Sequence, residues 1–157
     1  MNEQAFTGVR VLDFSQVLAG PFATQLMAQL GAQVIKVEQP VGGDMTRGLM
    51  SASSDGMAPS FLAANLGKRS LTLDLKNPKA KEVVHKLVAE ADVLVENFKP
   101  GTIERLGFGF DAMKAIKPDL VYASISGFGQ TGPRANLPAF DGAIQAYSGM
   151  MSISGHA

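Results

Sequence analysis

Residues 9–37 read VRVLDFSQVLAGPFATQLMAQLGAQVIKV, and this pattern decides the fold class. Val9 to Phe14 is a short, mostly apolar run, which predicts a buried strand. Pro21 then opens a helix at a position where its missing N–H costs nothing. Apolar residues recur on one helical face and predict its inner stripe: Phe22, Leu26 and Leu30, with Ala23 and Met27 beside them. With the apolar run Val34 to Val37, the stretch predicts a β-α-β unit with parallel strands.

The same alternation continues along the rest of the chain. Further strands are expected at 70–75, 93–95 and 120–126, and helices at 60–66, 78–91, 101–106, 111–116 and 141–147. Asn77 and Pro78 form a strong helix start, with asparagine as the N-cap and proline in the first turn. The sequence therefore predicts the α/β class, with a Rossmann-like, doubly wound parallel sheet in one domain over residues 1–157.

Composition excludes several classes of function. Lys and Arg number 14 and Asp and Glu 14, so no excess charge attracts nucleic acid or a membrane surface. The absence of cysteine excludes disulfides, thiolate metal sites and a cysteine nucleophile. His85 and His156 are too few and too far apart to indicate a metal cluster. No apolar run approaches the ~18 residues of a membrane-spanning helix, so a cytoplasmic protein is expected.

A glycine-rich phrase, GFGQTG at residues 127–132, matches the pattern G-x-G-x-x-G after a predicted strand. Pro133 and Pro138 follow it, and no acidic residue closes a next strand, so a dinucleotide site is not expected. The phrase is better explained as a loop that brings the backbone close to another ligand. The serine hydrolase motif G-x-S-x-G does not occur.

Basic side chains recur near the predicted strand ends, where ligands of open α/β sheets bind. They are Arg47, Lys68, Arg69, Lys76, Lys99 and Arg105. Singly, each is expected to be a solvated surface charge; as a set they could hold phosphate groups. Phe98 is either a core residue or a flat surface for an adenine ring. Ser15, in the first strand–helix turn, is either a helix cap or part of a ligand loop.

Four phrases in order resemble one family. They are residues 9–48, residues 65–83 (NLGKRSLTLDLKNPKAKEV), residues 91–110 (ADVLVENFKPGTIERLGFGF) and residues 121–141 (VYASISGFGQTGPRANLPAFD). Together they resemble the family III CoA-transferases (CaiB/BaiF, formyl-CoA transferase-like) over nearly the whole chain. The resemblance implies no tightly bound cofactor, with coenzyme A or acyl-CoA as substrate and a carboxylic acid as acceptor.

The resemblance also assigns ligand positions. CoA is expected to contact Leu18 and Ala19 at its pantetheine and thioester end; Leu73, Asp74, Leu75 and Lys76 at the adenosine; Asn97, Phe98, Lys99 and Arg105 at the adenine and phosphates; and Pro138, Ala139, Phe140 and Asp141 at the acyl pocket. The α-methylacyl-CoA racemases of the same superfamily place a catalytic histidine before the aspartate of this phrase. Phe140 stands there and cannot transfer a proton, so the racemase alternative is disfavoured.

The family mechanism uses an aspartate nucleophile and a covalent intermediate. That aspartate is expected beyond Ala157, because no acidic residue follows Asp141. The chain is therefore expected to be the N-terminal, CoA-binding part of a two-domain fold that interlocks as a homodimer, inactive alone and with apolar surface exposed. The alternative is a catalytically empty CoA-binding fragment.

Overall fold

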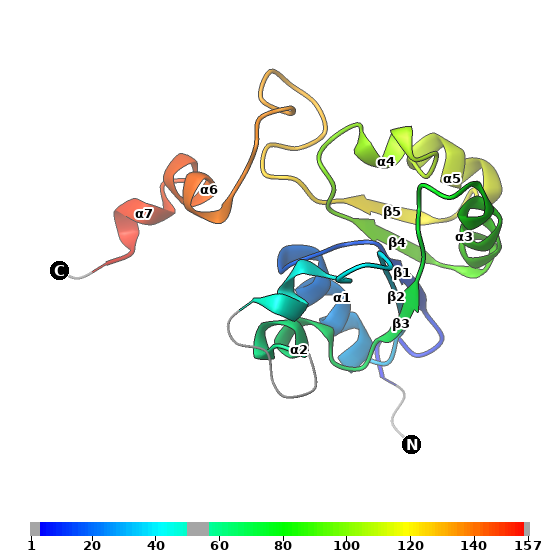
Figure 1. Ribbon diagram of the computed structural model, residues 1–157. Helices are drawn as coiled ribbons and strands as arrows, with labels where there is room; N and C mark the ends of the chain where they lie inside the picture. The colour runs from blue at the N-terminus through cyan, green and yellow to red at the C-terminus, as the bar shows by residue number, and fades with distance from the viewer. Residues whose placement is uncertain (1–3, 50–56, 156–157) are drawn as a thin grey trace.

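A five-stranded, all-parallel sheet forms the centre of the computed structural model, which describes residues 4–49 and 57–155 (Figure 1). The strands are β1 (Arg10–Asp13), β2 (Gln33–Glu38), β3 (Arg69–Thr72), β4 (Val93–Glu96) and β5 (Val121–Ser124). Their order in the sheet is β3-β2-β1-β4-β5. The predicted α/β class with a parallel sheet is confirmed, and the order reverses between β1 and β4.

Helices cover both faces of this sheet (Figure 1). On one side lie α1 (Ala19–Gln29) and α2 (Pro59–Asn65), and on the other α3 (Pro78–Glu90), α4 (Thr102–Arg105) and α5 (Phe110–Ile116). Alternate residues of β1 enter two separate cores. Leu12 packs with Val84 of α3 and Met113 of α5, whereas Val11 packs with Met27 of α1. The sheet is therefore doubly wound, with period-2 alternation feeding both layers.

The start of α3 follows the prediction. Asn77 Oδ1 accepts a hydrogen bond from Lys79 N at 3.0 Å, and Pro78 occupies the first turn. Ala80, Val84 and Val88 then form a buried stripe. Here the cap and the helical period are both local signals, so the sequence is enough to place this helix.

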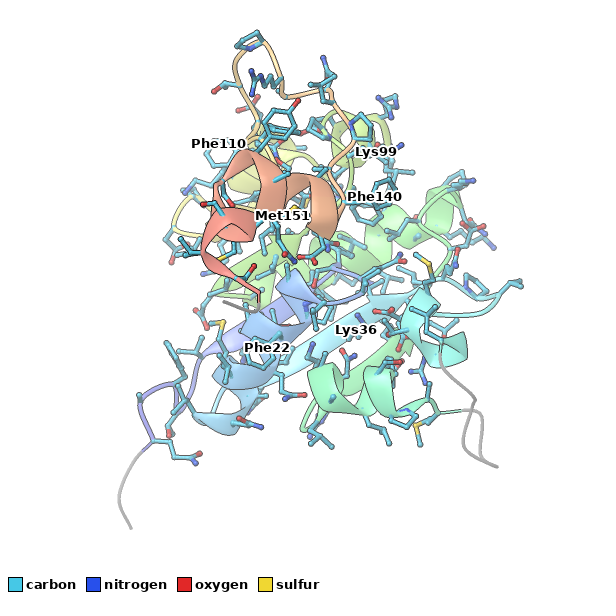
Figure 2. The ribbon with its side chains drawn as sticks, turned by 90° about the vertical axis from the view of Figure 1, so that its left-hand side faces the viewer. Phe22, Lys36, Lys99, Phe110, Phe140 and Met151 are labelled. Atoms are coloured by element: carbon cyan, nitrogen blue, oxygen red, sulfur yellow. The ribbon has the colours of Figure 1, made fainter. Side chains whose placement is uncertain are left out.

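The prediction for α1 was wrong in its buried face. The helix begins at Ala19, two residues before Pro21. Phe22, Leu26 and Leu30 lie outward and are 48%, 43% and 46% exposed (Figure 2 labels Phe22). The buried face carries Thr24, whose Oγ1 lies 2.6 Å from Asp13 Oδ2, and Gln25, whose Nε2 donates to the Ala63 carbonyl at 3.0 Å. Polar contacts with β1 and α2 therefore set the orientation of this helix.

Beyond β5 the chain leaves the sheet through a loop at 125–140 and ends in two short helices, α6 (Asp141–Tyr147) and α7 (Met150–Ile153). They project away from the layered body and contact each other (Figure 1). Their apolar side chains are exposed: Tyr147, Met150, Met151 and Ile153. Within the described residues no helix is both long and apolar enough to cross a membrane.

The two leucines Leu94 and Leu26 test the assignment of core and surface. Leu94→Ala should lower the free energy of unfolding by about 2–5 kcal/mol, because it leaves a cavity in a fully buried site. Leu26→Ala should cost less than about 1 kcal/mol. Urea unfolding followed by circular dichroism measures both. A loss for Leu26→Ala well above ~1 kcal/mol would show that the apolar face of α1 is buried after all.

Candidate functional site

The carboxyl ends of the five parallel strands meet at one edge of the sheet, and their loops line it. In open α/β sheets ligands bind at this edge, at the point where strand order reverses. Here that point lies between β1 and β4. The loop 14–18 follows β1, and the segment 97–101 follows β4. The fold therefore places these two segments next to each other at the expected ligand position.

Two pockets of about 130 Å³ each open at this edge, and Phe98 lines both. The first, called pocket A, lies among Gln16, residues 37–39, residues 73–76, Phe98 and Leu106. The second, called pocket B, lies among residues 97–100, residues 125–127, Ala135 and residues 137–140. Phe98 is half-buried and also packs against the core of α3 and α5. The sequence left open whether Phe98 is a core residue or a ligand surface. In the structure the same side chain contacts the core and lines both pockets.

The structure brings many of the predicted ligand residues into these pockets. Leu73, Asp74, Leu75 and Lys76 line pocket A, and Asn97, Lys99, Pro138, Ala139 and Phe140 line pocket B. Figure 2 shows Lys99 and Phe140 on the same side of the molecule. Gly127 lies so close to Ala139 that an added Cβ would stand 2.0 Å from the Ala139 Cβ, so the glycine phrase closes the wall of pocket B.

Other predicted residues lie outside the two pockets. Arg105 borders a separate, wider hollow with Tyr122 and donates to Thr102 Oγ1 at 2.9 Å. Leu18 is 63% exposed at the start of α1. Asp141 accepts a hydrogen bond from Gln145 at 2.5 Å and is exposed. Ala19, Leu18 and Asp141 line neither pocket.

Sequence reasoning missed Gln16 and Gln39, which both line pocket A. Each lies in a loop within three residues of the end of a parallel strand, and that position was the available signal. Ile125, the residue after β5, was also missed and carries the same signal. Leu106 follows α4 and reaches pocket A only through tertiary packing.

Two of the basic residues assigned to solvent or phosphate are instead paired inside the protein. Lys68 Nζ lies 2.9 Å from Asp13 Oδ2, with both side chains buried. Burial lowers the pKa of Lys68, and the Asp13 carboxylate opposes that shift. Arg47 forms a two-pronged contact with Glu38 at 2.6 and 2.7 Å and stacks over the Phe61 ring. Among the described residues, the lysines that line the two pockets are Lys76 and Lys99, and neither forms an ion pair there.

The first strand–helix turn also differs from expectation. Ser15 does not cap α1; its Oγ donates to Asp13 Oδ1. A further buried ion pair, Lys36 Nζ to Asp44 Oδ2 at 2.9 Å, lies beneath this turn. Burial alone would raise the pKa of Asp44, but hydrogen bonds from Lys36 and Thr46 outweigh it and lower that pKa. The buried carboxylates of Asp13 and Asp44 thus hold the loops at this edge of the sheet in place.

Glu96 ends β4 behind the pockets. Burial raises the pKa of this carboxyl group, and its Oε2 accepts a hydrogen bond from Phe98 N at 2.8 Å. Glu96 therefore holds the residue that lines both pockets. Within the described residues, no group of three His, Cys, Asp or Glu side chains could hold a metal ion.

A doubly wound sheet with pockets at its reversal point defines a ligand-binding α/β domain. A sequence profile described as CoA-transferase family III matches residues 6–157. The chain therefore belongs to the CoA-transferase family III, which confirms the resemblance read from its four phrases.

Relatives and solved structures agree with this assignment. The chain is 44% identical over 155 residues to a succinate–glutarate CoA-transferase of Agrobacterium fabrum, covering 95% of this chain and 39% of that protein. It is 46% identical over 155 residues to a formyl-CoA:oxalate CoA-transferase of Streptomyces coelicolor, covering 99% and 37%. A crystal structure of a CAIB/BAIF family protein from Brucella suis superposes with a TM-score of 0.92 at 42% identity, covering 99% and 42%. The chain thus spans about two-fifths of the length of these proteins.

Glu38 gives the candidate site a measurable pH dependence. Burial would raise its pKa, but hydrogen bonds from Arg47, Ser70 and the Asp44 main chain lower it from 4.5 to about 2. The stability that this ionised group contributes is complete above pH 4.5 and is lost as the pH falls toward 2. About 2 kcal/mol of the free energy of unfolding should therefore disappear between pH 7 and pH 3.

Glu38→Gln should lower the free energy of unfolding at pH 7 and flatten its decline below pH 4.5, measured by urea unfolding at a series of pH values. Ser70→Ala keeps the Glu38 carboxylate and removes one hydrogen bond that lowers its pKa. The pH at which the free energy of unfolding declines should therefore move upward in this variant. An unchanged acid slope in Glu38→Gln would show that other groups control it.

Proposed function

We propose that this chain forms the CoA-binding part of an acyl-CoA:carboxylate CoA-transferase. The observation that carries the proposal is the pair of pockets sharing Phe98 at the strand-order reversal, in a chain that belongs to CoA-transferase family III. The relatives named above are CoA-transferases with different donors and acceptors. The proposal therefore names the reaction class and leaves the acyl group open.

In this proposal the adenosine part of CoA lies along residues 73–76 in pocket A. Phe98 offers a ring face for stacking, and Lys76 in pocket A and Lys99 in pocket B pair with phosphates. Arg105 contacts the nucleotide from its neighbouring hollow. The acyl end enters pocket B against Pro138, Ala139 and Phe140, with Asp141 beyond them, and Leu18 and Ala19 approach the thioester from the first turn.

The reaction that follows is a carboxylate exchange through a covalent aspartyl intermediate. An aspartate attacks the acyl-CoA thioester, forming a mixed anhydride and releasing CoA thiolate. The thiolate attacks the aspartyl carbonyl, which releases the donor carboxylate and leaves an enzyme thioester. The acceptor carboxylate attacks this thioester, which releases CoA thiolate and forms a second mixed anhydride. The thiolate attacks the acceptor acyl carbonyl of this anhydride, which gives the new acyl-CoA and regenerates the aspartate carboxylate. Backbone N–H groups of the glycine-rich loop would stabilise the oxyanions.

None of the four carboxylates buried at this edge is proposed as the nucleophile. Asp13, Glu38 and Asp44 are buried and ion-paired, and Glu96 is buried behind Phe98. A carboxylate held in this way is a poor nucleophile, because attack would break its charge pairing in a desolvated site. This chain is therefore proposed to supply the CoA site to a catalytic aspartate from elsewhere in the complete enzyme.

The complete enzyme is proposed to be a homodimer. The exposed apolar side chains of α6 and α7 support this, because contiguous apolar surface of that kind commonly marks a protein interface.

Lys76→Ala tests the nucleotide assignment. It should weaken binding of CoA by about tenfold or more, because a charge-assisted contact to phosphate is worth about 1.5–3 kcal/mol. Binding of an acyl-pantetheine, which lacks the nucleotide, should be nearly unaffected. Isothermal titration calorimetry measures both. Lys79→Ala, an exposed lysine in the first turn of α3 that lines neither pocket, is the matched control. Equal losses for both ligands would count against Lys76 as a phosphate partner.

The catalytic assignment is tested by chemical trapping. When the 157-residue chain is mixed with succinyl-CoA and oxalate and quenched with hydroxylamine, mass spectrometry should find no hydroxamate on its residues. Free CoA should still raise its thermal unfolding temperature, because a ligand that binds only the native state stabilises it. A hydroxamate on any residue would place a nucleophile within this chain.

A further inference from the structure

The turn between β1 and α1 is held by side chains instead of by main-chain pairing. Ser15, Gln16 and Val17 form no backbone–backbone hydrogen bond with the described residues. Five of their main-chain groups are bonded by side chains from other parts of the sheet edge. The bonds are Ser15 N to Asp13 Oδ1 at 2.9 Å, Lys36 Nζ to Ser15 O at 2.6 Å, Gln16 N to Asn97 Oδ1 at 2.8 Å, Asn97 Nδ2 to Gln16 O at 2.7 Å, and Val17 N to Asp44 Oδ2 at 3.2 Å.

The backbone of this turn is strained. Val17 has φ +69°, and it is the one non-glycine residue with positive φ among residues 4–49 and 57–155. A β-branched side chain in this region is a genuine outlier, because its Cβ clashes with the backbone. Such a conformation persists only where the surroundings over-determine it, and it concentrates at functional sites. The side-chain anchors of the preceding paragraph supply that over-determination.

Asn97 is the anchor that joins the two sides of the site. It follows β4, and Gln16 follows β1, so their paired hydrogen bonds cross the point where strand order reverses. Gln16 lines pocket A and Asn97 lines pocket B. The amide of Asn97 thus uses one donor and one acceptor to fix the relative position of the two pocket walls.

The remaining anchors make the turn resistant to movement. Asp44 is buried, and its carboxylate is held by Lys36 and Thr46 while it faces Val17 N. The first turn of α1 presses against the other side, since a Cβ added at Gly20 would stand 2.3 Å from the Ser15 Cβ. Removing Asn97 would therefore free only the Gln16 side of the turn, next to the pockets.

We propose that Asn97 is a positioning residue that sets CoA affinity by holding the strained turn at Gln16 and Val17, and not through a contact of its own with CoA. This rests on the proposed function, since CoA is the ligand whose affinity is measured. The sequence resemblance assigned Asn97 to a direct contact with the nucleotide. Here Asn97 instead affects CoA affinity by its hydrogen bonds to the main chain of Gln16.

The test is a rescue. Asn97→Ala should weaken CoA binding about tenfold in calorimetry, because two hydrogen bonds that hold the competent turn are lost. Val17→Gly removes the steric cost of positive φ, since glycine adopts this region freely. If Asn97 acts by holding the turn, Asn97→Ala should cost at least about threefold less CoA affinity in the Val17→Gly background than in the wild-type background. The first cost is the double variant Asn97→Ala/Val17→Gly compared with Val17→Gly alone. Amide hydrogen exchange at Gln16 and Val17 should rise in Asn97→Ala and fall again in the double variant.

Asn65→Ala is the matched control. Asn65 also donates one side-chain bond, to the Phe61 carbonyl, and accepts one, from Lys68, but it lines neither pocket. It should lower stability, change CoA affinity less than about threefold, and show no rescue by Val17→Gly. Should Asn97→Ala prove unfolded by circular dichroism, Asn97→Asp, which keeps the oxygen facing Gln16 N, enters the same pair of measurements.

The outcomes separate the two claims. A wild-type chain that binds CoA, with an affinity loss in Asn97→Ala that Val17→Gly does not relieve, overturns the positioning role and favours direct contact. Unchanged affinity in Asn97→Ala also overturns it. A wild-type chain that does not bind CoA in calorimetry overturns the proposed function, and with it any role of Asn97 in CoA binding. Affinity loss with rescue and restored amide protection supports both.

Discussion

Buried charge pairs beneath the carboxyl edge of the sheet govern the shape of the site. Lys36 with Asp44, and Lys68 with Asp13, lie out of contact with water, and Arg47 closes over Glu38. A charge taken from water must be paired and hydrogen-bonded, and removing one partner typically costs about 3–5 kcal/mol. The loops that supply these partners are therefore fixed in place. The pockets inherit that rigidity, because residues of the same loops line them.

This constraint explains why polar residues occupy positions that hydrophobicity alone would give to leucine. Thr24 and Gln25 face inward on α1 because Asp13 and the Ala63 carbonyl need donors there. Phe22, Leu26 and Leu30 are left on the surface, whereas Met27 packs against the cluster around Val11. On this side of the sheet, hydrogen-bonded polar residues share the interior with a smaller apolar cluster around Val11, Val34 and Val95. The opposite layer, with Leu94, Val84 and Met113, follows apolar packing.

Phe98 belongs both to the hydrophobic core and to the candidate site. Its backbone is anchored by Glu96, its ring touches the core of α3 and α5, and its remaining surface lines both pockets. An aromatic wall supported in this way is pre-organised, so a ligand would not have to order it on binding. The turn between β1 and α1 is pre-organised in the same sense, because its strained conformation exists without a ligand.

Local spacing and the order of four phrases were enough to predict the parallel α/β architecture, the helix cap at Asn77, the helix at 141–147 and the family. The segment Asn97–Lys99 was expected just after a strand and follows β4, whereas Leu73–Leu75 were expected inside a strand at 70–75 and lie in the loop after β3. Three features could be learned only from the folded arrangement: the buried face of α1, the pairing of Lys68 with Asp13, and the hydrogen bonds of the Asn97 amide to the main chain of Gln16. The physical reason is that a charge or an amide is satisfied by whichever group the fold brings within hydrogen-bonding distance, here across 55 and 81 residues of chain.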